Sequence, residues 1–194
     1  MRASWQAGAF DRATTQALEG YGAEVFGYLV AVAGDHGLAG DAFSLLSERL
    51  WKTLPGFEWR CTLRGWVYLL ARNALTDLRR GPAGKPHVPL SQASAVGRLA
   101  VAIRTRTETH LRSEVKSALQ LLRESLPKDD QTLLILRLDR DMSWEEIAHV
   151  FAGEDTLSAA DVTRESARLR KRFQLVKQRF ATMARERGLV GSGK

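Results

Sequence analysis

The feature that most constrains the fold of this chain is a break in an otherwise helical pattern. On both sides of GPAGKPHVPLSQAS, residues 81–94, apolar residues recur at intervals of three and four, the period of one helix face. The segment itself has three prolines, two glycines and no periodicity, which is typical of a linker. The sequence therefore predicts an all-α protein of two small helical domains, residues 10–80 and 95–190, joined by this linker.

The first half predicts three helices. Apolar positions indicate a helix at residues 21–33 that ends at the following glycines, and a second helix at 42–54 with Asp41 as its N-cap. After a short loop, Thr62 is expected to cap a third helix over residues 63–80. Helices joined by such short loops are expected to pack together.

The second half predicts a long basic C-terminal helix with a short helix before it. Ser143 and Glu146 have the spacing of a capping box, and Ser158 and Asp161 repeat that spacing at the start of the last helix. A short helix, a turn and a longer helix are the arrangement of a helix-turn-helix, whose second helix enters the major groove of DNA. The outward positions of its first turns are then expected to bind DNA: Ala160, Thr163, Arg164, Ala167, Arg168 and Lys171.

Positive charge is concentrated on this last helix. The formal net charge is +7, and residues 160–188 contain nine basic and three acidic residues, which leaves +6 in that segment. Such a surface attracts polyanions, and arginine binds guanine in a bidentate way while lysine neutralises phosphate. Two other interpretations stay open. The basic face could be merely solvated, or the apolar positions could form a short coiled-coil seam.

No arrangement of residues indicates an enzyme or a metal site. Cys61 is the single cysteine and has no nearby base, and the four histidines lack ligand spacing: His36, His87, His110 and His149. Phosphate-loop, nucleophile-elbow and dinucleotide motifs are absent. We therefore expect no cofactor, no metal and no small-molecule substrate. The lone cysteine and the lack of a signal peptide or a long apolar run predict a cytoplasmic protein without membrane insertion.

Taken together, the two halves resemble an extracytoplasmic-function sigma factor, the smallest type of bacterial sigma factor. Residues 21–80 are similar to region two of that family, with FGYLVAVAGDHGLAGDAFSLLSERLW, LPGF and LRGWVYLLARNALTDLRR in the family's order and spacing. Residues 119–173 are similar to region four, with LRESLPKDDQTLLILRLDRDMSWEEIAHVF and RLRKRF. The resemblance implies a protein that directs core RNA polymerase to specific promoters and assists strand opening.

The resemblance also implies which residues meet each partner. Region two would bind the clamp helices of the polymerase through Asp41, Ser44, Leu45 and Glu48. It would recognise and melt the minus-ten promoter element through a loop and the third helix, with Phe57, Trp59, Arg60, Arg64, Trp66 and Asn73. Region four would bind the polymerase flap and read the minus-thirty-five element. An anti-sigma protein is a further partner that the family leads us to expect.

Some positions depart from the family pattern, and some have a second interpretation. Ser44 and Ser47 stand where the family has glutamine and an aromatic residue, and the turn AGEDTLS before the last helix is longer than usual. Trp66 could belong to the core, and Asn73 could be merely solvated. The alternative function is a stand-alone helix-turn-helix regulator that binds duplex DNA without polymerase. A third hypothesis is a basic adaptor for an acidic protein or RNA.

Overall fold

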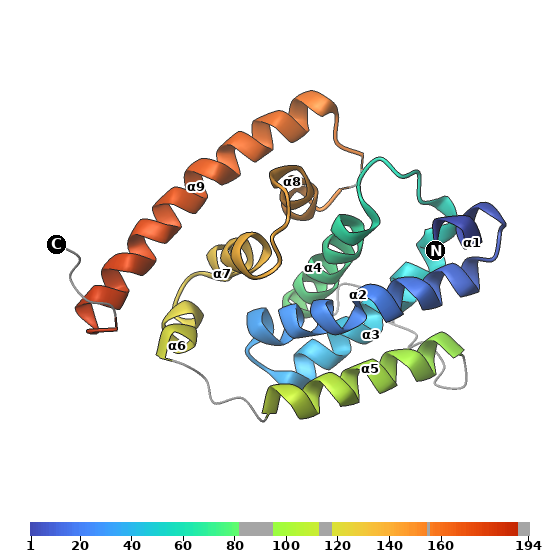
Figure 1. The fold of residues 1–194 in the computed structure, drawn as a ribbon, viewed down its shortest axis with the longest axis horizontal. Coiled ribbons are helices and arrows are strands. Elements are labelled where there is room, and N and C mark those ends of the chain that lie inside the picture. The colour runs from blue at the N-terminus through green and yellow to red at the C-terminus, as the bar shows by residue number, and fades with distance from the viewer. Residues whose placement is uncertain (82–94, 113–117, 155, 190–194) are drawn as a thin grey trace.

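The computed structural model describes residues 1–81, 95–112, 118–154 and 156–189, and all regular structure in those ranges is helical. The elements in chain order are α1 (Arg2–Gln6), α2 (Phe10–Ala33), α3 (His36–Thr53), η1 (Leu54–Gly56), α4 (Leu63–Arg80), α5 (Ala95–Arg112), α6 (Ala118–Glu124), α7 (Lys128–Leu134), η2 (Ile135–Asp139), α8 (Trp144–Ala152) and α9 (Ala159–Glu186) (Figure 1). The all-α class is confirmed. Except for Gly81, the expected linker lies outside the described residues.

The ends of the first helices follow local signals in the sequence. Gly34 ends α2 with a left-handed φ of 72°, and the Thr62 hydroxyl caps α4 by accepting a hydrogen bond from the amide of Gly65. The expected N-cap at Asp41 is wrong. Asp35 caps α3 instead, because its carboxylate accepts a 2.6 Å hydrogen bond from the Leu38 amide. Asp41 therefore lies inside α3, beyond the turn whose amides need a cap.

Helices α2, α3, α4 and α5 pack together as what we call the first bundle. The sequence grouped α5 with the second domain, but in the structure α5 lies along α2 and α3. Glycines permit this close approach. A Cβ added at Gly22 of α2 would lie 2.9 Å from the Ile103 side chain, and one added at Gly40 of α3 would lie 3.1 Å from Arg104.

Helices α6 to α9, together with η2, form the second bundle. Leu169, Phe173 and Val176 of α9 are buried, and Phe180 and Met183 pack against the same core. The apolar stripe of α9 thus packs against the protein's own core. The coiled-coil interpretation would instead have this stripe bind a partner helix. Among the described residues, no helix combines the length and the hydropathy needed to cross a bilayer.

The capping signals of the second bundle are realised to different extents. Both hydrogen bonds of the capping box are present between Ser143 and Glu146 at the start of α8. At the start of α9, the Ser158 hydroxyl accepts from the Asp161 amide, but it also donates to the Asp161 carboxylate. In a full capping box this carboxylate would accept a hydrogen bond from the backbone amide of Ser158. Here it accepts one from the Ser158 hydroxyl.

The two bundles meet along α4. Helix α8 packs on α4, and the buried side chains of both bundles belong to one continuous core. In Figure 1, α7 and α8 lie between α4 and α9, so α9 runs along the outer edge of the molecule. The arrangement leaves one face of α9 open while it covers one side of α4.

Candidate nucleic-acid interface

The first turns of α9 expose every side chain of the last helix that the sequence predicted to contact DNA. These residues are Ala160, Thr163, Arg164, Ala167, Arg168 and Lys171. The opposite side of the helix is anchored: Leu169 is fully buried, and the Ser166 hydroxyl donates a 3.1 Å hydrogen bond to the Trp144 carbonyl of α8. An exposed, cationic helix face held by a shorter helix has the shape and charge that entry into a major groove requires.

Two arginines of this face are paired with acidic residues of the same helix. Arg164 pairs with Asp161, and the Nε of Arg168 donates a 2.8 Å hydrogen bond to Glu165. The pKa of Asp161 is lowered by the Ser158 hydroxyl and by Arg164, and the pKa of Glu165 is lowered by Arg168. Because these pairs are exposed and span a single turn, phosphate oxygens can replace the carboxylates at little cost.

Arg64 of α4 is held by both bundles. Its guanidinium donates 2.9 and 3.2 Å hydrogen bonds to the Glu24 carboxylate of α2, and another of 2.9 Å to the Arg140 carbonyl. Arg140 in turn donates to the Glu24 carbonyl at 3.2 Å. The bond to Glu24 raises the pKa of Arg64, so the guanidinium stays charged at any physiological pH. Arg64 therefore lies in a hydrogen-bonded contact between the bundles.

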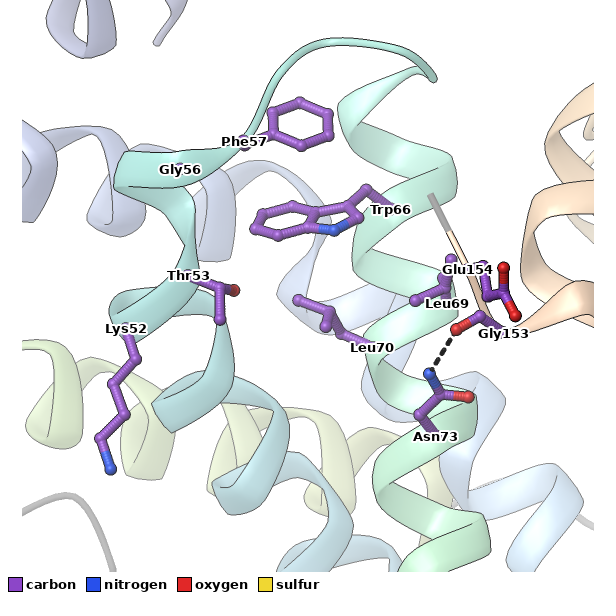
Figure 2. Close-up of a pocket in the computed structure, with 10 residues that line it drawn as sticks. All are labelled: Lys52, Thr53, Gly56, Phe57, Trp66, Leu69, Leu70, Asn73, Gly153 and Glu154. Carbon is purple, nitrogen blue, oxygen red and sulfur yellow. Dashed lines mark hydrogen bonds between the residues drawn. The ribbon is translucent and has the colours of Figure 1, made fainter. Parts of the chain in front are cut away.

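Two further residues of α4 contact the second bundle. Arg72 donates a 3.0 Å hydrogen bond to Asp129, and its guanidinium lies 4.9 Å from the centre of the Phe151 ring. The amide of Asn73 donates a 3.1 Å hydrogen bond to the Gly153 carbonyl, drawn as the dashed line in Figure 2. Gly153 begins the long turn before α9, so this turn contacts α4. Asn73 is half-buried in that contact, and the merely solvated interpretation is wrong.

The aromatic residues expected at the minus-ten element form a stack that is mostly internal. Phe57 is 2% exposed and Trp66 is 4% exposed, and their rings stack with centroids 4.4 Å apart (Figure 2). Trp66 is thus a core residue, as one of its two interpretations predicted. Trp59 is half-buried, with Trp5 packed edge-on at 5.6 Å and Arg2 over its ring at 4.9 Å. Its φ of 59° is unusual for so large a residue.

The remaining predicted residues do not form one continuous exposed face. Arg60 is exposed and forms a 2.6 Å ion pair with Glu58. In the predicted polymerase-binding set, Asp41 is exposed and Ser44 is half-buried, whereas Leu45 and Glu48 are buried. Helix α5 packs on α3 next to this set, since a Cβ added at Gly40 would lie 3.1 Å from the Arg104 side chain. Among the described residues, no three His, Cys, Asp or Glu side chains gather closely enough to hold a metal ion.

Sequence reasoning missed the groups that bind the α4 side chains. Glu24, Asp129 and Arg140 come from helices and a turn far away in the chain, and no local pattern marks them. Gly65 did carry a signal, because a glycine inside a helix often marks a close approach of another element. A Cβ added at Gly65 would lie 3.5 Å from both Cβ and Cγ of Glu146 in α8.

Comparison with protein-family models, with curated proteins and with solved structures gave no match. Any function assigned to this chain therefore rests on its own residues and geometry.

Proposed function

We propose that this chain is a promoter-specificity subunit of bacterial RNA polymerase, a sigma factor of the extracytoplasmic-function type. In this role α9 reads the minus-thirty-five element, and α3, α4 and the loop between them bind the polymerase and hold the melted minus-ten element. The observation that carries the proposal is the exposed basic face on the first turns of α9. The motif order of residues 21–80 and 119–173 supports it.

The chemistry of α9 suits a groove contact. Arg164 and Arg168 supply bidentate donors for guanine, and Lys171 supplies a charge for phosphate. Ala160 and Ala167 are small, so the helix backbone approaches the base edges without obstruction. At 28 residues the helix is about 42 Å long, and its far end extends well beyond one groove. Base contacts are thus expected only in the first turns.

Transcription with purified components tests the proposal. Core polymerase with this protein should start run-off transcripts at a defined promoter, and the double variant Arg164→Ala, Arg168→Ala should lose most of that activity. Each base-contacting arginine is expected to contribute about 1–3 kcal/mol. The matched control is Arg185→Ala, Arg187→Ala, which removes the same charge from exposed positions at the other end of α9. Absence of any specific start site across a genomic promoter library would refute the function.

A stand-alone regulator is the second candidate function. The observation that favours it is the contrast between the exposed α9 face and the covered α4 side, because duplex binding needs only α9. Tight operator binding by the isolated protein, with no polymerase subunit captured from the host by the tagged chain, would support this candidate. Capture of core polymerase supports the sigma factor.

A further inference from the structure

Helix α1 packs beside the loop that the proposed function assigns to the melted minus-ten element. This loop, residues 57–62, joins η1 to the start of α4, and we call it the Trp59 loop. Figure 1 shows α1 next to it, packed against the first turns of α2. The chain reverses between α1 and α2 at Gly8, whose φ of 70° favours glycine. The predicted first domain began at residue 10, so α1 lies outside every predicted site.

Trp5 is the residue of α1 that ties the Trp59 loop to the rest of the first bundle. Its Nε1 donates a 2.8 Å hydrogen bond to the carbonyl of Leu54 in η1, the turn that leads into the loop. Its ring packs edge-on against Trp59, with centroids 5.6 Å apart, and edge-on against Phe10 of α2 at 6.5 Å. Edge-to-face contacts of this kind fix the orientation of both rings. One side chain therefore connects α2, η1 and the loop.

Arg2 is the second residue of α1 that contacts the loop. Its guanidinium lies 4.9 Å from the centre of the Trp59 ring, within the range of a cation–π interaction. Arg2, Trp59 and Arg60 line a cleft of about 820 Å³, and Glu145 and Glu146 line the α8 side of the same cleft. The arginines thus belong to α1 and the loop, and the carboxylates to the second bundle. A polyanionic strand is attracted to the side that α1 helps to form.

The conformation of Trp59 depends on support from its neighbours. Its φ of 59° lies in the left-handed region, which large side chains rarely adopt. Its Nε1 is buried and has no hydrogen-bond partner in the part of the chain that the structure describes. Both features oppose this conformation, so the contacts of the ring must offset them. The ring contacts are Trp5, Arg2 and Phe57, and two of these three residues belong to α1.

We infer that α1 is a positioning element for strand capture, in which Trp5 and Arg2 hold Trp59 and its loop in the conformation that binds the melted minus-ten strand. The inference rests on the proposed function and adds α1 to the same site. An unpaired base binds more tightly to an aromatic side chain that is already in place than to one that must first be ordered, because ordering costs conformational entropy. Trp5 and Arg2 act through Trp59, and their effect requires no contact with DNA.

The kinetics of promoter opening with core polymerase test the inference. Trp5→Ala should slow open-complex formation about tenfold, measured by permanganate reactivity of unpaired thymines, while the affinity of the closed complex changes by less than about twofold. Trp5→Phe keeps a ring edge for Trp59 but loses the donor to Leu54, so its rate should lie between those of Trp5→Ala and the parent. An unchanged rate in Trp5→Ala refutes the inference. A parallel loss of rate and closed-complex affinity also refutes it, because that result means a general loss of structure.

A matched pair of arginine variants tests the contribution of Arg2. Arg2→Ala removes the cation over Trp59 and should slow open-complex formation several-fold, whereas Arg2→Lys keeps a cation there and should recover part of the rate. Arg12→Ala is the control, since it removes the same charge from an exposed position of α2. It should open promoters at the rate of the parent. Equal rates in Arg2→Ala and Arg12→Ala would exclude Arg2 from the positioning role.

A measurement on the free protein separates this inference from the proposed function. The protein is labelled with fluorotryptophan, and the fluorine resonance of Trp59 is identified by its loss in Trp59→Phe. The shift of this resonance between H₂O and D₂O reports solvent exposure, and it should be larger in Trp5→Ala and Arg2→Ala than in the parent and in Arg12→Ala. Equal values in all four proteins overturn the inference. If the parent starts no transcripts with core polymerase, the proposed function fails, and the role in strand capture fails with it even where α1 holds Trp59.

Discussion

Helices α4 and α9 both carry a series of arginines, but the two series have different partners. Arg64 and Arg72 of α4 bind groups that come from other helices and from the second bundle. Arg164 and Arg168 of α9 pair with carboxylates three residues earlier in the same helix. The comparison teaches that the number of arginines on a helix does not decide its availability to a polyanion. What decides it is whether the acceptors belong to another element that must move.

The difference sets an order of events for the proposed function. The α9 face is exposed in the structure, so contact with duplex DNA needs no rearrangement. The donors of Arg64, Arg72 and Asn73 on α4 are hydrogen-bonded to the second bundle, so strand capture by them would require those bonds to break. Duplex recognition should therefore precede strand capture.

The largest expected effect is a difference in the free energy of unfolding between substitutions on the two faces of α9. Leu169→Ala removes a fully buried side chain and should lower the free energy of unfolding by about 2–5 kcal/mol. Arg168→Ala, at the neighbouring exposed position, should change it by less than about 0.5 kcal/mol. Urea denaturation followed by circular dichroism measures both. Comparable losses in the two variants would mean that the Arg168 face is also packed.

A smaller effect on stability is expected in α4. Arg64→Ala leaves the Glu24 carboxylate and the Arg140 carbonyl without their donor and should lower the free energy of unfolding by about 1.5–3 kcal/mol. Arg60→Ala is the control, since Arg60 is exposed and pairs only with Glu58 among the contacts of the described residues. If both variants keep the unfolding midpoint of the parent, the contrast between α4 and α9 is lost.

Local signals in the sequence were sufficient for α4 and for the α9 face, but they placed the start of α3 six residues too late and the start of α2 eleven residues too late. The apolar spacing that buries Leu169 and Phe173 also fixes which arginines face outward, and the caps at Thr62 and Ser143 followed from residue type. The position of Trp66 on an apolar face likewise indicated its burial.

The partners of α4 could not be predicted in this way. Arg64 binds a carboxylate forty residues earlier and a carbonyl 76 residues later, and helical periodicity carries no information about such distant contacts. The same limit applies to α5. Its apolar face was evident from the spacing, but periodicity does not say which bundle that face covers. Small residues such as Gly22 and Gly65 were the available hint, because close packing between helices requires them.

A smaller effect is expected on the salt dependence of DNA binding, and it should differ between α9 and α4. Arg164→Gln should weaken binding of duplex promoter DNA and lower the slope of log affinity against log salt by about 1, because one phosphate or base contact is lost. Arg72→Gln should leave that slope unchanged in the free protein, since Arg72 is bound to Asp129 of α7. Fluorescence anisotropy over a salt series measures both. An equal decrease in slope for the two variants would show that α4 already contacts the duplex.

The smallest expected effect concerns pH and the acidic partners on α9. The pKa values of Asp161 and Glu165 lie below their ordinary values of 3.8 and 4.5, the first mainly through the Ser158 hydroxyl and the second through Arg168. A lowered pKa means that the folded state favours the charged form, so these groups add stability above their ordinary pKa values and lose it as the pH falls through the folded ones. The melting temperature should therefore decrease below about pH 4.5 less steeply in Asp161→Asn, Glu165→Gln than in the parent. Identical pH profiles would mean that the carboxylates contribute nothing to the start of α9, and that its arginines are held without them.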